Sequence, residues 1–171
     1  RGKKKKGKKK KKADPRKLEV LDACFVLGRA CSKVSDFDDC ERYFKQAKEG
    51  YEEQLGPDSE KALDVTRSLI MVTCSSNVEL IDKLRMLVER MVGMLGEENV
   101  VTLDTLNTLG VMLQENGEFE KARKVLERCI AGREKVLGED HKNTLAAVMN
   151  LGNVYQRLKD YEKALEYYER A

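Results

Sequence analysis

Cysteine and histidine are the first residues to consider, because they most often supply nucleophiles, redox centres and zinc ligands. The sequence contains five cysteines and one histidine. Cys24, Cys31 and Cys40 are seven and nine residues apart and form no C-x-x-C pair, and His141 lacks a serine or cysteine partner pattern. The sequence therefore predicts no metal site, no cofactor and no catalytic constellation, and the chain is not expected to be an enzyme.

The cysteines fit a structural role better. Cys24, Cys31, Cys40 and Cys129 share the helical spacing of neighbouring apolar residues, where a free cysteine behaves as a small hydrophobic side chain. Cys74, beside an irregular turn, is the cysteine predicted to be exposed. An odd number of thiols in a long helical chain indicates reduced cysteines and an intracellular location, cytoplasmic or alternatively nuclear.

The second chemical group is a run of lysines at the N-terminus. Residues 1–17 hold twelve Lys or Arg and one Asp, which leaves 21 basic and 29 acidic residues in the remainder of the chain. Such a run predicts a disordered tail that acts as a nuclear import signal, binds nucleic acid or an acidic protein surface, or is a solvated linker. No aromatic residue is interleaved, which argues against base stacking. The lysines of this tail are Lys3, Lys4, Lys5, Lys6, Lys8, Lys9, Lys10, Lys11 and Lys12.

The elements that position these groups follow from an internal repeat. The strings LGPDS, LGEEN and LGEDH begin at residues 55, 95 and 137, at offsets of 40 and 42 residues. A Leu-Gly pair ends at Gly28, Gly110 and Gly152, and nine residues after each of these glycines an aromatic residue follows an acidic one. Three markers that share one period indicate a repeat protein.

Each unit reads as two amphipathic helices joined by a short polar turn, because its apolar residues recur three and four positions apart. The recurring glycines, together with Ala122 and Ala164, predict close helix crossings, since glycine within a helix is otherwise unfavourable. Asp58, Asn99 and Asp140 lie where helix N-caps are expected. The predicted helices span residues 17–34, 37–54, 59–74, 77–94, 98–115, 119–136, 141–158 and 161–171.

These residues resemble the tetratricopeptide repeat, whose first helix carries Leu-Gly and an aromatic and whose second carries an aromatic and Ala. The 42-residue period and the string REKVLGEDH at 133–141 are similar to the repeats of kinesin light chains. HEAT and armadillo repeats share the period but lack these phases. The resemblance implies an all-α, right-handed α-solenoid of about four helical hairpins, at 18–58, 59–98, 99–140 and 141–171, after a disordered tail at 1–17. The second unit is degenerate, with Ile70 in place of glycine.

In such solenoids the first helix of every unit lines a concave groove. Asparagine offers both a donor and an acceptor to a peptide backbone, and arginine can bind a carboxylate in a bidentate manner. Asn107 and Asn150 match the asparagines that kinesin light chain grooves carry, and the alternative is that these faces are merely solvated. The predicted groove residues are Asp22, Phe25, Arg29, Arg67, Met71, Asn107, Val111, Gln114, Met149, Asn150, Asn153 and Arg157.

The predicted function is a noncatalytic scaffold or adaptor that binds a protein segment, a peptide or helix, in this groove. The alternative is a nucleic-acid-associated or nuclear protein that acts through its lysine tail. No apolar run approaches the roughly 20 residues that a membrane span needs. The sequence ends inside a helix, so we expect an incomplete repeat that promotes self-association through Tyr161, Ala164 and Tyr168.

Overall fold

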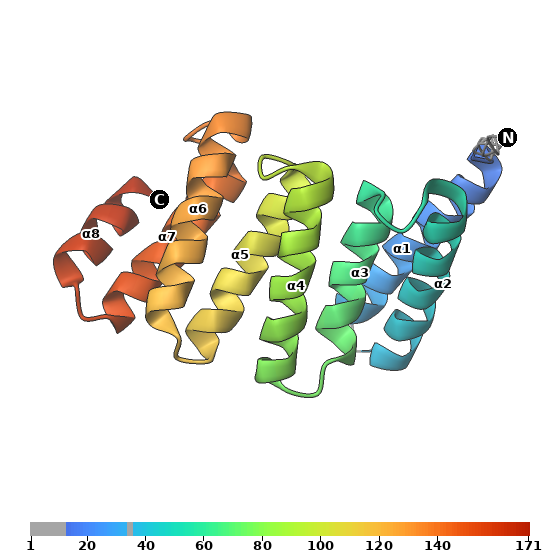
Figure 1. The fold of residues 1–171 in the computed structure, drawn as a ribbon. Helices are drawn as coiled ribbons and strands as arrows, with labels where there is room; N and C mark the ends of the chain where they lie inside the picture. Colours follow the sequence, from blue (N-terminus) through green and yellow to red (C-terminus); the bar gives the residue numbers. More distant parts are fainter. Residues whose placement is uncertain (1–12, 34–35) are drawn as a thin grey trace, which may run out of the picture. The chain divides into compact units, whose positions relative to one another are not determined.

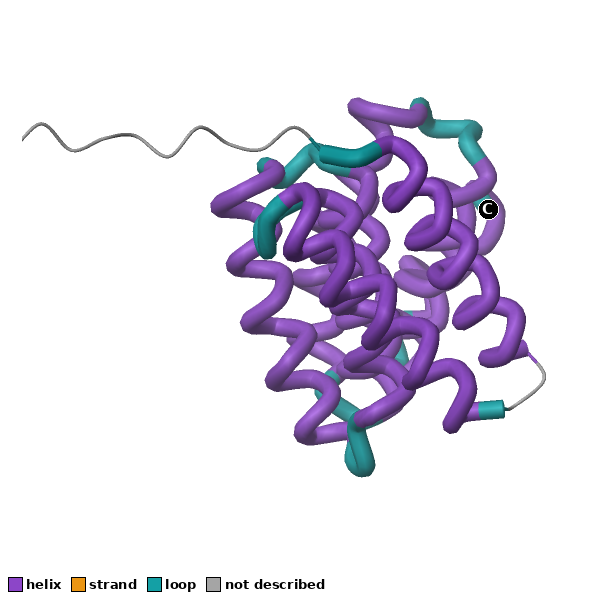
Figure 2. The backbone as a smooth tube through the Cα atoms, turned by 90° about the vertical axis from the view of Figure 1, so that its right-hand side faces the viewer, coloured by secondary structure: helices purple, strands orange, loops and turns teal. Residues whose placement is uncertain are grey.

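The structure, a computed structural model, describes residues 13–33 and 36–171. The nine tail lysines that were predicted to bind anionic partners lie outside the described residues. Within the described residues the chain forms eight helices and no strand (Figures 1 and 2). The helices are α1 (Pro15–Lys33), α2 (Phe37–Leu55), α3 (Glu60–Thr73), α4 (Asn77–Leu95), α5 (Val100–Glu115), α6 (Phe119–Leu137), α7 (Lys142–Arg157) and α8 (Tyr161–Arg170).

The observed helix ends lie within two residues of the predicted ones. The largest departure with a consequence is at α1, which begins at Pro15, so the predicted tail at 1–17 is too long. Proline suits a first helical position because its missing N–H group would have no partner within the helix. Asp14 caps this end, since its Oδ1 accepts a hydrogen bond from the backbone N–H of Arg16 at 3.0 Å.

Two of the predicted N-caps have a clear outcome. Asn99 caps α5, because its Oδ1 accepts a hydrogen bond from the Val101 N–H at 2.8 Å. The predicted cap of α7 at Asp140 is wrong by one residue: His141 caps this helix, and its Nδ1 accepts from the Asn143 N–H at 3.1 Å. The single histidine thus has a structural role that requires a lone pair on Nδ1.

The repeated Leu-Gly string marks the end of the second helix in the first three hairpins. Gly56, Gly96 and Gly138 follow α2, α4 and α6 with φ angles of 98°, 91° and 94°. These angles fall in the region that L-residues rarely adopt, so glycine is the residue that ends these helices without strain. The glycine of the repeated string is therefore explained by the positive φ angle that the backbone adopts at these helix ends.

The chain divides into two compact units, one up to Val65 and one from Thr66 onward. In the first unit α1 packs against α2. A Cβ atom on Gly28 would lie 2.6 Å from the ring of Phe44, which confirms the predicted close crossing. Cys40 lies beside this crossing, and its thiol donates to the carbonyl oxygen of Gly28 at 3.2 Å.

In the second unit α4 packs on α5, and α5 to α8 pack in sequence, with α5 also contacting α7. Cβ atoms on Gly110 and Gly152 would lie 2.6 Å from Leu126 and 2.8 Å from Tyr168. Ala122 and Ala164 are 0% and 3% exposed. The predicted crossings are therefore present in this unit too. Because Ala164 is buried, the expected uncovered face at the C-terminal end consists of Tyr161 and Tyr168 without it.

The five cysteines are all free. Cys24, Cys40 and Cys129 are buried as predicted, whereas Cys31 is half-buried. Cys74 is also half-buried and packs against the core of the second unit, so the prediction that it is the exposed cysteine is wrong.

Candidate peptide-binding surface

The predicted groove residues Asn107 and Asn150 lie together in the structure. Asn107 lies on α5 and Asn150 on α7, and the amide NH2 group of Asn150 donates a hydrogen bond to Oδ1 of Asn107 at 3.2 Å. Both side chains are half-buried. The pair leaves the NH2 group of Asn107 and the carbonyl oxygen of Asn150 available, which is one donor and one acceptor side by side.

The other predicted residues of these two helices share the same faces. Val111 and Gln114 follow Asn107 one and two turns along α5, while Asn153 and Arg157 follow Asn150 in the same way along α7. Because residues three and four apart lie on one face of a helix, they extend the surface along both helices. We call this surface the α5/α7 face; its residues are Asn107, Val111, Gln114, Met149, Asn150, Asn153 and Arg157.

Asn153 is held by the next helix of the chain. The Tyr168 hydroxyl on α8 donates to Oδ1 of Asn153 at 2.7 Å, and the same tyrosine packs over Gly152. The carbonyl oxygen of Asn153 is therefore engaged, and its NH2 group is the part that remains for a ligand. Met149 is 51% exposed and gives the face an apolar contact point.

A buried arginine fixes the two helices that form the α5/α7 face. Arg133 on α6 is 4% exposed, and it donates from Nη2 to Asp104 Oδ1 and from Nη1 to the Asn143 carbonyl oxygen, both at 2.6 Å. Asp104 lies one turn before Asn107, and Asn143 lies two turns before Asn150. This contact therefore sets the register between α5 and α7. In the sequence, Arg133 is the first residue of REKVLGEDH, the string that resembles kinesin light chain repeats, and this string is the signal that could have identified it.

The remaining predicted groove residues lie on α1 and α3. Phe25 is half-buried and packs its ring against Phe44, with the ring centroids 5.8 Å apart, while Arg29 is exposed on α1. Met71 on α3 is 40% exposed and Arg67 is half-buried. The contacts of the structure bring together the predicted residues of α5 and α7.

Asp22 differs from its prediction, because its carboxylate is already engaged. It accepts hydrogen bonds from the Lys61 ammonium group at 2.5 and 2.7 Å and from the Tyr51 hydroxyl. The hydrogen bond from Lys61 and then that from Tyr51 lower the pKa of Asp22 below its ordinary value. The aspartate therefore stabilises the first unit and is not an open contact point for a ligand.

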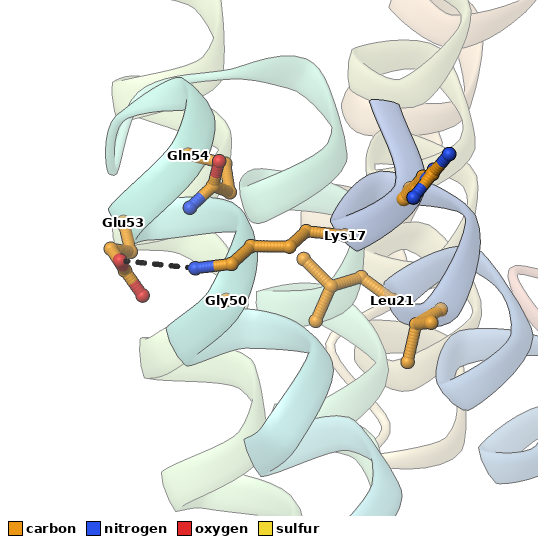
Figure 3. Close-up of a pocket in the computed structure, with 7 residues that line it drawn as sticks. Lys17, Leu21, Gly50, Glu53 and Gln54 are labelled. Carbon is orange, nitrogen blue, oxygen red and sulfur yellow. Dashed lines mark ion pairs between the residues drawn. The ribbon is translucent and has the colours of Figure 1, made fainter. Parts of the chain in front are cut away.

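A cavity of about 340 Å³ lies between α1 and α2 in the first unit (Figure 3). Its wall includes Leu21 and Gly50, and a Cβ atom on Gly50 would lie 2.2 Å from Leu21. Lys17 extends across it toward Glu53, with Nζ and Oε1 3.9 Å apart (Figure 3). The atoms that line the cavity are mainly apolar.

The buried Cys129 is held in its unreactive thiol form. Burial raises the pKa of the Cys129 thiol to about 11, so very little thiolate is present at neutral pH. Among the described residues no group of three or more His, Cys, Asp or Glu side chains is placed to hold a metal ion. None of the helices in the described residues is both long and apolar enough to cross a membrane.

Comparisons with known proteins place this arrangement in a class. Residues 101–171 match the family model of the tetratricopeptide repeat. No curated protein sequence matches the chain significantly. The all-α solenoid fold of tetratricopeptide type, predicted from the sequence, is confirmed.

Solved structures identify the variety of repeat. The fold is similar to BtubC (BKLC) from P. vanneervenii, with a TM-score of 0.73 and 19% identity over 88% of this chain and 61% of that one. It is also similar to nearly identical TPR-like repeats of a protein assigned as a kinesin light chain from Podosopora anserina, with a TM-score of 0.75 and 21% identity over 90% of this chain and 74% of that one. The repeats of this chain are therefore kinesin light chain-like in fold.

Proposed function

We propose that this protein is a noncatalytic scaffold or adaptor, and that its α5/α7 face binds a peptide segment of a partner protein. The hydrogen bond between Asn150 and Asn107 carries this proposal, because it orients an amide donor and a carbonyl acceptor next to each other. Tetratricopeptide repeats in general mediate protein–protein interaction, which agrees with this use of the face.

An extended peptide is the ligand that this chemistry fits. Its backbone presents N–H and C=O groups in alternation, so the carbonyl oxygen of Asn150 and the NH2 group of Asn107 can each pair with it. Val111 and Met149 offer apolar contacts beside the pair, and exposed Arg157 can bind a carboxylate of the ligand. The amides would then position the backbone, and the flanking residues would select the side chains.

The experiment is a pull-down with the full chain, analysed by quantitative mass spectrometry. The variant Asn107→Ala/Asn150→Ala/Asn153→Ala is compared with wild type and with a control, Asn77→Ala, which changes an exposed asparagine at the start of α4. We expect partners that are retained by the control and lost with the triple variant, while the helical circular dichroism of both variants is unchanged. Partners that bind all three proteins equally would refute the assignment of the face.

A second candidate function concerns the lysine tail. The observation that favours it is the charge distribution, since twelve basic residues precede a remainder with 21 basic and 29 acidic residues. Such a tail would bind an acidic protein surface or nucleic acid phosphates, while the acidic remainder would repel them. Removing residues 1–12 would abolish this binding, and nuclear rather than cytoplasmic location of the protein would depend on the same residues.

A further inference from the structure

A cleft opens in the second unit on a side of α5 that does not carry Asn107. Its floor is formed by Leu106, Leu109 and Leu113 of α5, and its sides are formed by α4 and α6. The cavity has a volume of about 340 Å³, which is in the usual range for a ligand pocket. We call it the α4/α6 cleft. The residues that line its sides are Arg85, Val88, Glu89, Lys121, Lys124, Val125 and Arg128.

The repeat itself explains why this cleft is not filled by side chains, although the leucines of its floor are only 1–3% exposed. Forty-two residues after Leu113 and Val125, the chain has Tyr155 and Tyr167, which lie on α7 and α8. Those two rings stack with their centroids 5.2 Å apart and their planes 12° apart. The depression beside them is lined largely by charged side chains, those of Glu120, Arg123, Asp160 and Lys163. The smaller Leu113 and Val125 fill less space, so the α4/α6 cleft keeps an apolar floor.

The charges of the cleft also depart from the rest of the chain. Four of its lining residues are cationic and one, Glu89, is anionic, whereas residues 18–171 are acidic overall. Arg85 is a clear instance, because the residue 42 positions later is Glu127, which accepts a hydrogen bond from the Tyr155 hydroxyl at 3.0 Å. This change of charge between equivalent positions makes the lining of the α4/α6 cleft basic, whereas the depression in the next repeat is lined by both acidic and basic side chains.

Three of the four cations have carboxylate partners outside the lining. Lys121 pairs with Glu118, Arg128 pairs with Glu97, and Arg85 lies 3.6 Å from Asp82. The side chains of the three cations are 43–65% exposed, and exposed ion pairs are weak, so a ligand carboxylate can share or replace the partner. In the described part of the chain Lys124 forms no ion pair. The rim is thus able to receive additional negative charge.

We infer that the α4/α6 cleft is a second docking site, for an acidic peptide segment of a partner protein that carries a leucine or phenylalanine among aspartates and glutamates. The apolar side chain enters the cleft above Leu109 and Leu113, and the carboxylates contact the rim, with Lys124 as the first partner. The lining contains no aromatic ring on which a nucleic acid base could stack, so an acidic peptide fits it better than a nucleic acid. This site does not depend on the α5/α7 face.

The test is a selection from a phage-displayed library of random peptides on the full wild-type chain, with counter-selection on Val125→Tyr. This variant places in the cleft the ring that the chain has 42 residues later, at a half-buried position on the edge of the core, so its helical circular dichroism is first compared with that of wild type. Peptides that bind the lysine tail are retained by the variant and are therefore removed. We expect the surviving sequences to be rich in Asp and Glu around a Leu or Phe.

The selected peptides are then synthesised with a fluorophore and measured by fluorescence anisotropy. We expect Val125→Tyr and Lys124→Glu each to raise the Kd at least about tenfold, which corresponds to about 1.4 kcal/mol. Asn107→Ala, on the other face of α5, should leave the Kd unchanged within about twofold. A selection that enriches no acidic apolar sequence, or peptides whose Kd responds to Asn107→Ala and not to Lys124→Glu, would overturn the inference.

Discussion

The first and third hairpins use equivalent positions for different chemistry. Asp22, Tyr51 and Lys61 of the first unit correspond to Asp104, Arg133 and Asn143 of the second, at a distance of 82 residues in each case. In the first, the carboxylate is bound by a tyrosine and by a lysine whose side chain is 45% exposed. In the third, it is bound by an arginine whose side chain is 5% exposed. One register position therefore holds a solvated contact in one hairpin and a buried one in the other.

The two positions also differ in the helices that they connect. Arg133 contacts both α5 and α7 and so supports the asparagine pair, whereas Lys61 binds the Asp22 carboxylate and lies over the ring of Tyr51. The position of Asn107 shows the same contrast, because its equivalent 82 residues earlier is Phe25, which packs on Phe44. The third hairpin therefore has a polar side chain, Asn107, at this position, and the first hairpin has an aromatic side chain, Phe25, that packs against its neighbour.

The largest expected effect is on the buried contact. Replacement of Asp104 by alanine leaves the Arg133 guanidinium buried without its charged partner, and should lower the free energy of unfolding by about 3 kcal/mol. The measurement is urea denaturation followed by circular dichroism. Asp82→Ala, which removes an exposed partner of Arg85 at 3.6 Å, serves as the control, with an expected change below about 0.5 kcal/mol. Equal effects of the two variants would show that burial of Arg133 is unimportant.

A smaller effect is expected at the equivalent aspartate of the first hairpin. Asp22→Ala should cost about 1 kcal/mol, because its partner Lys61 remains solvated after the change. The pKa of Asp22 is lowered in the folded protein, so its contribution is present above the ordinary aspartate pKa and is lost as the pH falls through the lower, folded value. Urea midpoints at pH 7 and pH 3 should therefore differ less in Asp22→Ala than in wild type.

Tyr51, which donates to Asp22, should make the stability depend on pH in the alkaline range. Burial, and next the hydrogen bond to Asp22, raise the pKa of Tyr51 above its ordinary value. Its contribution is therefore complete below the ordinary tyrosine pKa of about 10 and falls by up to about 1.4 kcal/mol per pH unit above it. The loss of stability between pH 7.5 and pH 11 should be smaller in Tyr51→Phe than in wild type. Tyr161→Phe, at a position 64% exposed, should behave like wild type.

The smallest effect on stability is expected at the α5/α7 face. Asn150→Ala removes one half-buried hydrogen bond between neutral groups, so it should lower the free energy of unfolding by about 0.5–1 kcal/mol. The same change should nonetheless abolish peptide binding to the face. A loss of stability as large as that of Asp104→Ala would identify the asparagine pair as a structural element of the hairpins, without a surface role.

The sequence predicted the helices and their crossings because both are set locally. The Leu-Gly strings indicated the helix ends, and the recurring Gly110 and Gly152 indicated where a second helix approaches. It also proposed Asn107 and Asn150 for one surface, since helical phase alone decides which side chains share a face. It did not predict that Asp22 is occupied by Lys61, because that contact joins residues 39 positions apart.

By itself the sequence determined the helical repeat, its period and the phase of each side chain, because a fixed pattern of apolar residues and glycines permits few other arrangements. Only the tertiary structure decided what the polar residues at those phases contact. Arg133 is a buried link between α6, α5 and α7. Tyr155 stacks on Tyr167, whereas Leu113 and Val125, at the equivalent positions 42 residues earlier, leave a cleft. The physical reason is that periodicity specifies the direction of a side chain from its own helix, whereas burial and charge pairing depend on which neighbouring helix lies in that direction.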